Sequence, residues 1–267
     1  MIAKLHIQAS LRNGITYLNK SYFTPPFKVA NITEDKKLNK LDLMLMCSSP
    51  GILDEDDYEL KIDVDANCTM QLHTQSYQRL FKMKKGAEQL MEMHLKKGSS
   101  FVYLPHPSVP HGESIFTAKN NIYLSDGCTL TWGEILTCGR KLNGEIFQFS
   151  KYHNITQIYL NNKLIIKENL LMQPSLIDVN GLGQLSGYTH QATLIYLDEN
   201  TDTKNLIEAT TAYLSEQNEI IFGITTAPIN GIIIRLLGQK AEQLHNCLKE
   251  VSSNISLFTI PHSPIES

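Results

Sequence analysis

The sequence has few of the features that mark secreted, membrane-spanning or disulfide-bonded proteins. Its five cysteines are odd in number and include no Cys-x-x-Cys pair, so neither a disulfide framework nor a zinc site is indicated. The first residues turn polar at once, unlike a signal peptide, and no run approaches the roughly 20 apolar residues of a membrane helix. We therefore expect reduced thiols, a cytoplasmic location, and neither secretion nor membrane insertion.

Sequence motifs of common enzyme classes are also missing. There is no Gly-x-Ser-x-Gly elbow, no phosphate-binding loop, no His-Glu-x-x-His and no Cys/His cluster at ligand spacing. The net charge of −3, with 19% charged residues, indicates no nucleic-acid partner and no anionic membrane partner. With 267 residues, 42% of them hydrophobic, the chain is long enough to bury a full core. A soluble protein without a recognisable catalytic centre is expected.

Strand-like runs of one shape recur at intervals of about 30 residues. Each run combines a turn residue and small or polar residues with alternating apolar side chains, and the runs are Asn67–Leu72, Gly98–Leu104 and Cys128–Arg140. A short strand unit of this length buries its apolar face only when the next unit stacks on it. The predicted fold is therefore mainly β, with a stacked, β-solenoid-like (β-helical) sheet architecture.

Two Asn-containing pairs predict turns within the β region, which extends to about residue 172. Asn13-Gly14 separates the arms of a hairpin, residues 2–9 and 15–18, because both residues tolerate the positive φ of a tight turn. Asn120-Asn121 likewise predicts a turn between strands around 114–118 and 121–124.

Helical spacing is seen only toward the C-terminus. Thr201-Asp202 predicts the cap of a helix that continues to about residue 217, and residues 239–251 carry a second apolar helical face. Two strands, 219–226 and 231–237, lie between these helices in the sequence. We predict a single domain over residues 1–267, with a β-stacked body at 1–198 and an α+β C-terminal appendage at 199–260.

Glu134 is the residue with the most unusual surroundings. It lies beside the chain's one tryptophan, Trp132, and is followed by Ile135 and Leu136. It is either an edge carboxylate that faces water or a buried one that needs a partner such as Arg140. From spacing alone, a structural role is favoured over a functional one.

Acidic and histidine clusters are further candidates for a site. The segment Asp54–Asp57 precedes a strand, and such a run is more often a solvated loop than a metal site, because a cation needs convergent oxygens. His106 and His111 lie in a proline-rich loop, where a surface or hydrogen-bonding role is favoured over metal binding.

Short motifs along most of the chain occur in the order typical of one family. They are Tyr22–Phe27, Ser48-Ser49-Pro50-Gly51 with acids after it, His73-Thr74-Gln75 ahead of Phe81, Leu104-Pro105-His106-Pro107, Glu134-Ile135-Leu136 with Gly139-Arg140, and Gly187–His190. In this ordered set the sequence resembles the urease accessory protein UreD family, also called UreH. It departs from the family after Gly51, where Ile52 and Glu55-Asp56-Asp57 replace a second glycine and a Gly-Asp, so either Asp56 or Asp57 matches the family acid.

The resemblance implies a non-catalytic, mostly β, solenoid-like scaffold with two helices. Proteins of this family bind apo-urease and the partners UreF and UreG, a GTPase, so that nickel reaches the urease active site, and they are proposed to pass nickel through an interior tunnel. No cofactor would be bound permanently, and Ni²⁺ would be bound transiently. Oxygen and imidazole ligands would release Ni²⁺ more readily than thiolates would.

The resemblance also implies roles for particular residues. A nickel path would involve Asp56, Asp57, Glu134, His73 and His190. Structural or partner-binding motif positions would be Ser49, Pro50, Gly51, Gln75, Pro105, Gly139 and Arg140.

Two other classes of function stay open at this point. A β-solenoid could bind carbohydrate or cleave a glycan with two acids about 5–10 Å apart, although the sequence pairs no such acids. A binding module or structural solenoid without a metal role is the third class. Glycan turnover would support the enzyme, and co-purification with apo-urease and a GTPase would support the scaffold.

Overall fold

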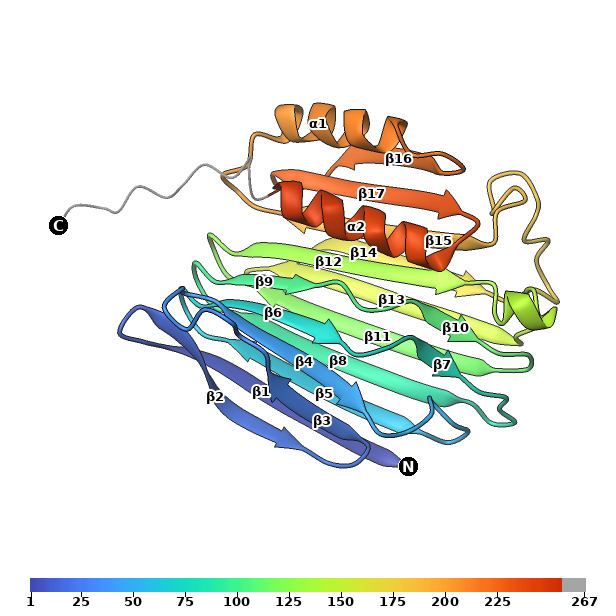
Figure 1. The fold of residues 1–267 in the computed structure, drawn as a ribbon, viewed down its shortest axis with the longest axis horizontal. Coiled ribbons are helices and arrows are strands. Elements are labelled where there is room, and N and C mark those ends of the chain that lie inside the picture. Colours follow the sequence, from blue (N-terminus) through green and yellow to red (C-terminus); the bar gives the residue numbers. More distant parts are fainter. Residues whose placement is uncertain (256–267) are drawn as a thin grey trace.

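The structure, a computed structural model, describes residues 1–255 and contains two β-sheets that pack against each other (Figure 1). In spatial order the seven-stranded sheet consists of β14 (Lys163–Met172), β13 (Lys151–Leu160), β11 (Ile115–Leu124), β8 (Ala87–Leu95), β5 (Asp57–Val64), β1 (Ile2–Arg12) and β2 (Ile15–Phe23). The path of the ten-stranded sheet is β16 (Ile221–Thr226), β17 (Gly231–Gly238), β15 (His190–Leu197), β12 (Thr129–Thr137), β9 (Ser100–Tyr103), β6 (Thr69–Thr74), β4 (Leu41–Cys47) and β3 (Phe27–Asn31). Its two short strands off this path are β7 (Gln78–Leu80) and β10 (Ser108–Pro110), and the helices of the described residues are η1 (Lys141–Asn143), α1 (Thr203–Ser215) and α2 (Ala241–Ile255).

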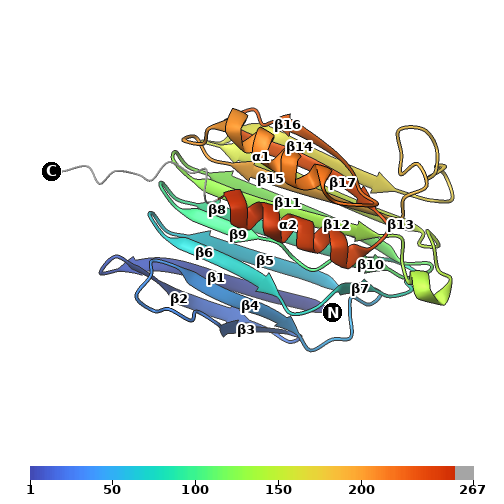
Figure 2. The ribbon, with the colours of Figure 1, turned by 45° about the horizontal axis from the view of Figure 1, so that its top comes forward.

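From β4 to β13 the chain passes repeatedly from one sheet to the other. Apart from β7 and β10, successive strands belong alternately to the ten-stranded and the seven-stranded sheet, and neighbours within each sheet run parallel. Figure 2 shows the resulting progression, from the blue N-terminal strands to the orange and red C-terminal elements. The prediction of a mainly β chain is confirmed, and the finer description as a β-solenoid stays a prediction.

The recurring runs found in the sequence lie on neighbouring parallel strands in register. Met70 on β6 is opposite Phe101 on β9, which is opposite Leu130 on β12, and all three side chains are fully buried. The residues that turn the chain into these strands, Asn67, Gly98 and Gly127, all have positive φ, a conformation that glycine and asparagine tolerate best. The predicted stacking of the repeat is therefore confirmed.

Two apolar clusters cover the two faces of the ten-stranded sheet. Side chains alternate between the faces of a strand, so Leu130, Trp132 and Leu136 of β12 face the other sheet and belong to the core between the sheets. Ile135 points the opposite way, into a second cluster that α1 and α2 form with β15 and β17. Figure 1 shows both helices over these C-terminal strands.

The predicted turn at Asn120-Asn121 is wrong. β11 continues through both residues from Ile115 to Leu124, and the side chain of Asn120 is buried. Asparagine pairs are typical of turns, but the period-two alternation does not stop here, because Asn120 lies between the buried Ala118 and Ile122. By contrast, the predicted hairpin at Asn13-Gly14 is confirmed, with β1 and β2 antiparallel around it.

The C-terminal elements agree with the predicted helix–strand–strand–helix order. The carboxylate of Asp202 accepts a hydrogen bond from the backbone N–H of Asn205 and so caps α1. β17 pairs with β15, so the hairpin of the predicted appendage continues the ten-stranded sheet. Residues 256–260 of that appendage lie outside the described residues, and the division at 198/199 stays a prediction. Within residues 1–255, no helix combines the length and the apolar character that crossing a membrane requires.

Candidate functional site

The side chain of Glu134 lies between the two sheets and is held by hydrogen bonds from uncharged groups. It points inward because it follows Trp132 by two residues on β12. Its Oε1 accepts from the indole Nε1 of Trp132 at 2.7 Å and from the hydroxyl of Thr156 at 2.6 Å, and its Oε2 accepts from Nδ2 of Asn154 at 2.6 Å. A longer contact of 3.4 Å comes from Nδ2 of Asn120.

The donors from the other sheet form a buried polar cluster of their own. Asn120 on β11 and Asn154 and Thr156 on β13 are all buried. Nδ2 of Asn120 donates to Oδ1 of Asn154 at 3.1 Å and to the hydroxyl of Thr156 at 2.9 Å. Buried polar groups are stable when they are fully hydrogen-bonded, so this cluster fixes Glu134 across the gap between the sheets.

Of the two predicted environments of Glu134, the structure agrees with the inward-facing carboxylate that needs partners, but those partners are not the predicted Arg140. The carboxylate is only partly buried, yet it faces the other sheet and not open solvent. Arg140 is not its partner, because the Arg140 guanidinium forms an ion pair with Glu145 at the end of β12. Neutral donors take the place of the expected cation.

Two buried tyrosines lie near Glu134. Burial, reinforced by the negative charge of Glu134, raises the pKa of both Tyr103 and Tyr152 far above the ordinary value for a phenol. Both phenols are therefore neutral at any physiological pH.

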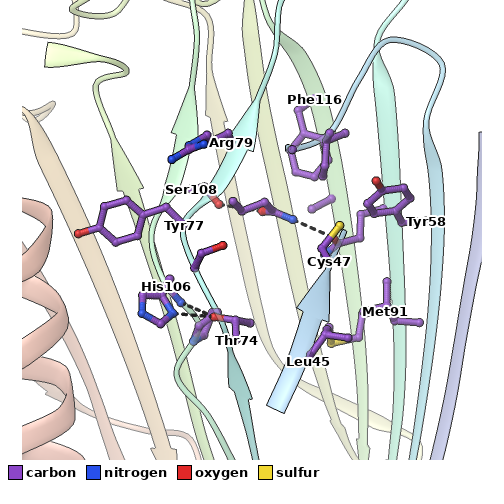
Figure 3. A pocket seen from close by; sticks show the side chains of 18 of the residues that line it. Leu45, Cys47, Tyr58, Thr74, Tyr77, Arg79, Met91, His106, Ser108 and Phe116 are labelled. Carbon is purple, nitrogen blue, oxygen red and sulfur yellow. Dashed lines mark hydrogen bonds between the residues drawn. The ribbon is translucent and has the colours of Figure 1, made fainter. Parts of the chain in front are cut away.

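A cavity of about 150 Å³, here named the interior cavity, leads from Glu134 between the sheets to the end of β4. A single water needs roughly 10–15 Å³ by the same kind of measure, so several waters or a hydrated ion fit inside. Figure 3 shows part of its lining, with Tyr58, Cys47 and Phe116 on one side and Tyr77 and His106 on the other. Most of the motif positions predicted from the resemblance line this one cavity: Ser49, Pro50, Gly51, Gln75 and Pro105.

The Cys47 thiol and the Tyr58 phenol lie at one end of the interior cavity, and both have raised pKa values. Burial raises the pKa of the Cys47 thiol above its ordinary value. Burial, followed by the charge of Asp56, raises the pKa of Tyr58 far above the ordinary value. Because a metal binds a thiolate and not a thiol, this raised pKa disfavours metal binding by Cys47, a residue that is otherwise exposed.

A second cavity, here named the edge cavity, lies on the other side of Glu134. Its volume is about 260 Å³, and Glu134, Tyr152 and Asn154 line both cavities. Its far end is lined by Glu168 on β14 and Arg235 on β17. Glu134 therefore lies where the interior cavity and the edge cavity meet.

The acids of the segment Asp54–Asp57 do not converge on one point. Asp54 accepts from the backbone N–H groups of Lys85 and Gly86, and these hydrogen bonds lower the pKa of its carboxyl. Asp56 is buried and accepts from the backbone N–H of Leu53, the amino group of Met1 and the hydroxyl of Tyr58.

Asp57 differs from Asp56 because its side chain is exposed at the start of β5. Of the two candidates for the family acid, only Asp56 is connected to the interior cavity, through Tyr58.

The two histidines predicted to lie on the metal path are not brought together with Glu134. His73 alternates with the inward-facing Leu72 on β6, so it lies on the opposite face of the ten-stranded sheet, where its Nε2 is 3.6 Å from Oδ1 of Asp42. His190 is opposite Thr137 on β12 and lies on that same outer face, where burial lowers the pKa of its imidazole to about 4.

The remaining motif positions, Gly139 and Arg140, shape the chain after β12. Gly139 has a φ of +115°, and an added Cβ would lie 2.8 Å from the carbonyl oxygen of Pro110. A side chain is therefore excluded there. Arg140 then pairs with Glu145, which also accepts from the backbone N–H of Gly112.

Residues 1–255 contain no group of three or more His, Cys, Asp or Glu side chains arranged to hold a metal ion.

Several residues of the site were missed in the sequence. Asn154 and Thr156 lie on the same face of β13 as the buried Tyr152 and Ile158. Two polar residues at inward-facing positions were therefore a usable signal in the sequence. Glu168 and Arg235 are 67 residues apart, and no local pattern connects them.

Comparisons with known proteins identify the family of the chain. Residues 1–262 match the family described as "UreD urease accessory protein". The chain is 47% identical over 256 residues to the urease accessory protein UreD of Flavobacterium johnsoniae, which covers 96% of this chain and 92% of that protein. It is 32% identical over 248 residues to the protein of the same name from Acetivibrio thermocellus, covering 92% of this chain and 94% of that protein. The chain therefore belongs to the UreD family of urease accessory proteins.

Proposed function

We propose that this protein acts in the cytoplasm as a non-catalytic scaffold for urease maturation. It would bind apo-urease together with UreF and the GTPase UreG, and Ni²⁺ would pass through it on the way to the urease active site. The family match over the whole described chain supports the maturation role. The observation that carries the nickel path is that Glu134 lines both the interior cavity and the edge cavity.

The chemistry around Glu134 suits an ion that is passed on and not retained. A carboxylate between two cavities attracts a divalent cation, and amide and hydroxyl oxygens of Asn120, Asn154 and Thr156 are further hard ligands. The short hydrogen bonds to Glu134 compete with a bound cation for the same oxygens, which weakens binding. The raised pKa of the Cys47 thiol disfavours the thiolate form, which would bind Ni²⁺ strongly.

Of the other residues expected on the nickel path, we include Asp56 in the proposed path and leave out the rest. Asp56 lies behind Tyr58 at the lining of the interior cavity and would add negative charge there. Asp57 is exposed, and His73 and His190 lie on the outer face of the ten-stranded sheet, so the interior path that we propose does not use them.

We also propose a solenoid-like description of the scaffold. The alternation of successive strands between the two sheets supports it, because every two passages add one strand to each sheet. The path for nickel would then lie between the sheets, where every stacked unit contributes lining residues.

A glycan-cleaving role receives less support. The second carboxylate of the edge cavity, Glu168, is bound by Arg235 through both of its oxygens and so is not available as an acid or base.

The test measures urease activity and nickel content in cells that carry the urease structural genes and the other accessory genes. The chain would be intact, deleted, or changed by Glu134→Gln, with Glu92→Gln on the exposed side of β8 as the matched control. We expect deletion to leave urease made but without nickel, and Glu134→Gln to lower its nickel content while the complex still co-purifies. Full activity without the chain would contradict the maturation role, and normal nickel content with Glu134→Gln would contradict the path through Glu134.

A further inference from the structure

An ion pair joins the two sheets at the far end of the edge cavity. Nη2 of Arg235 on β17 donates to Oε1 and Oε2 of Glu168 on β14 at 2.6 and 2.7 Å. Among the ion pairs of residues 1–255, this is the one that connects a strand of one sheet to a strand of the other. Because β14 is the last strand of the seven-stranded sheet, this ion pair lies where the gap between the two sheets opens at their edge.

The ion pair is continuous with the polar cluster around Glu134. In the ten-stranded sheet Glu134 is opposite Thr193, which is opposite Arg235. In the seven-stranded sheet Thr156, a donor to Glu134, is opposite Glu168. Neighbouring strands lie about 4.8 Å apart, so the backbones at Glu134 and Arg235 are separated by about 10 Å.

The guanidinium of Arg235 changes the charge that a cation would encounter at the Glu168 end of the edge cavity. A free Glu168 would offer a second carboxylate to the edge cavity. With Arg235 in place, both of its oxygens are occupied and its charge is balanced. Arginine stays charged at every physiological pH, so this positive charge is permanent.

The geometry also leaves room for Arg235 to move. Its side chain is 56% exposed, and its hydrogen bonds to the described residues use Nη2 alone. Gly223 on β16, opposite Arg235, has no atom within 4 Å of the place where a Cβ would be. The side chain at position 235 thus has open space on the side of β16.

We propose that Arg235 is a charge barrier that keeps divalent cations from Glu168, and that Glu168 becomes a cation ligand of the edge cavity when Arg235 moves away. This inference rests on the proposed passage of Ni²⁺ and assigns its control at one end. The ligand class is a divalent transition-metal ion with oxygen ligands.

The test measures Ni²⁺ binding to the purified full chain by titration calorimetry. Arg235→Met removes the charge, Glu168→Gln removes the ligand, and the double variant removes both. We expect Arg235→Met to bind Ni²⁺ about tenfold more tightly than the unchanged protein, because a unit positive charge is removed near the site. Glu168→Gln and the double variant should bind no more tightly than the unchanged protein.

A control separates the barrier from a general effect of charge. Lys167 is the neighbour of Glu168 on β14, with its exposed side chain on the other face of the sheet. Lys167→Met removes the same charge from the same strand and should leave Ni²⁺ affinity unchanged. The barrier is overturned if Arg235→Met does not tighten binding, if Lys167→Met tightens it equally, or if the double variant binds as tightly as Arg235→Met.

The proposed charge barrier at Arg235 and the proposed nickel path through Glu134 can be contradicted independently of each other. If Arg235→Met tightens Ni²⁺ binding while Glu134→Gln leaves the nickel content of urease normal, the barrier stands and the path through Glu134 is wrong. If Glu134→Gln lowers the nickel content while Arg235→Met binds Ni²⁺ as the unchanged protein does, the path stands and the barrier is wrong.

Discussion

The indole of Trp132 donates a hydrogen bond of 2.7 Å to the carboxylate of Glu134, two residues further along the same strand. Trp132 is almost completely buried, so this bond orients Glu134 from a rigid position. The remaining short bonds to the carboxylate come from the opposite sheet. Glu134 is thus a point at which the two sheets share a polar contact beside an apolar core.

Loss of the Glu134 carboxylate should destabilise the fold. Glu134→Ala leaves the donors of Trp132, Asn154 and Thr156 without their acceptor, and each unsatisfied buried group costs about 1–3 kcal/mol. Because water from the cavities can replace part of the lost bonding, we expect the free energy of unfolding to fall by about 2–4 kcal/mol in urea denaturation. Thr156→Val, which removes one donor, should cost about 1 kcal/mol. Unchanged stability of Glu134→Ala would show that the carboxylate is not a structural link.

A side chain at position 51 should disturb the lining of the interior cavity. An added Cβ at Gly51 would lie 2.8 Å from the ring of Phe81 and 2.9 Å from Cβ of Arg79. Gly51→Ala should therefore lower the free energy of unfolding by about 2 kcal/mol or more, measured by thermal or urea denaturation. Gly223→Ala is the matched control, because nothing lies within 4 Å of its Cβ position. Equal effects of the two substitutions would contradict this explanation.

His245 should make the fold sensitive to mild acid. This imidazole on α2 is buried, and burial, followed by the charge of Lys249, lowers its pKa from 6.5 to about 4. The unfolded chain therefore binds a proton at a higher pH than the folded chain, so the contribution of His245 to stability is complete above pH 6.5 and is lost as the pH falls toward 4. We expect His245→Asn to reduce the slope of the free energy of unfolding between these two values, measured by urea denaturation at a series of pH values, while His190 still contributes to the remaining slope. His153→Asn, at a surface histidine, should keep the slope of the unchanged protein.

The carboxyl of Glu145 should affect the stability of the fold at lower pH than His245 does. The hydrogen bonds from Arg140 lower the pKa of its carboxyl from 4.5 to about 2. A lowered folded-state pKa adds stability above pH 4.5 that is lost as the pH falls toward 2. Urea denaturation of Glu145→Gln should show a shallower loss of stability across this range. High salt should reduce the difference from the unchanged protein, because the pair is partly exposed. A difference between Glu145→Gln and the unchanged protein that is present in acid but absent at neutral pH would have the opposite sign and would contradict the assignment.

Periodicity in the sequence predicted much of the fold because it is a local property. The recurring runs that carry Met70, Phe101 and Leu130 predicted that their strands stack side by side. The prediction failed at Asn120, where a residue pair typical of turns lies inside a buried strand. There the contacts with Asn154 and Thr156 outweigh the local preference for a turn.

The sequence by itself determined the mainly β class, the two C-terminal helices and, through its ordered motifs, the family, because these depend on residues close together in the chain or on their order. Only the tertiary structure decided which groups meet. It gave Glu134 neutral donors from β11 and β13 in place of Arg140, placed His73 and His190 on the far face of the sheet, and brought Glu168 to Arg235. The physical reason is that these contacts cross between two sheets, and the side chains that meet there depend on the packing of both sheets and not on spacing along one strand.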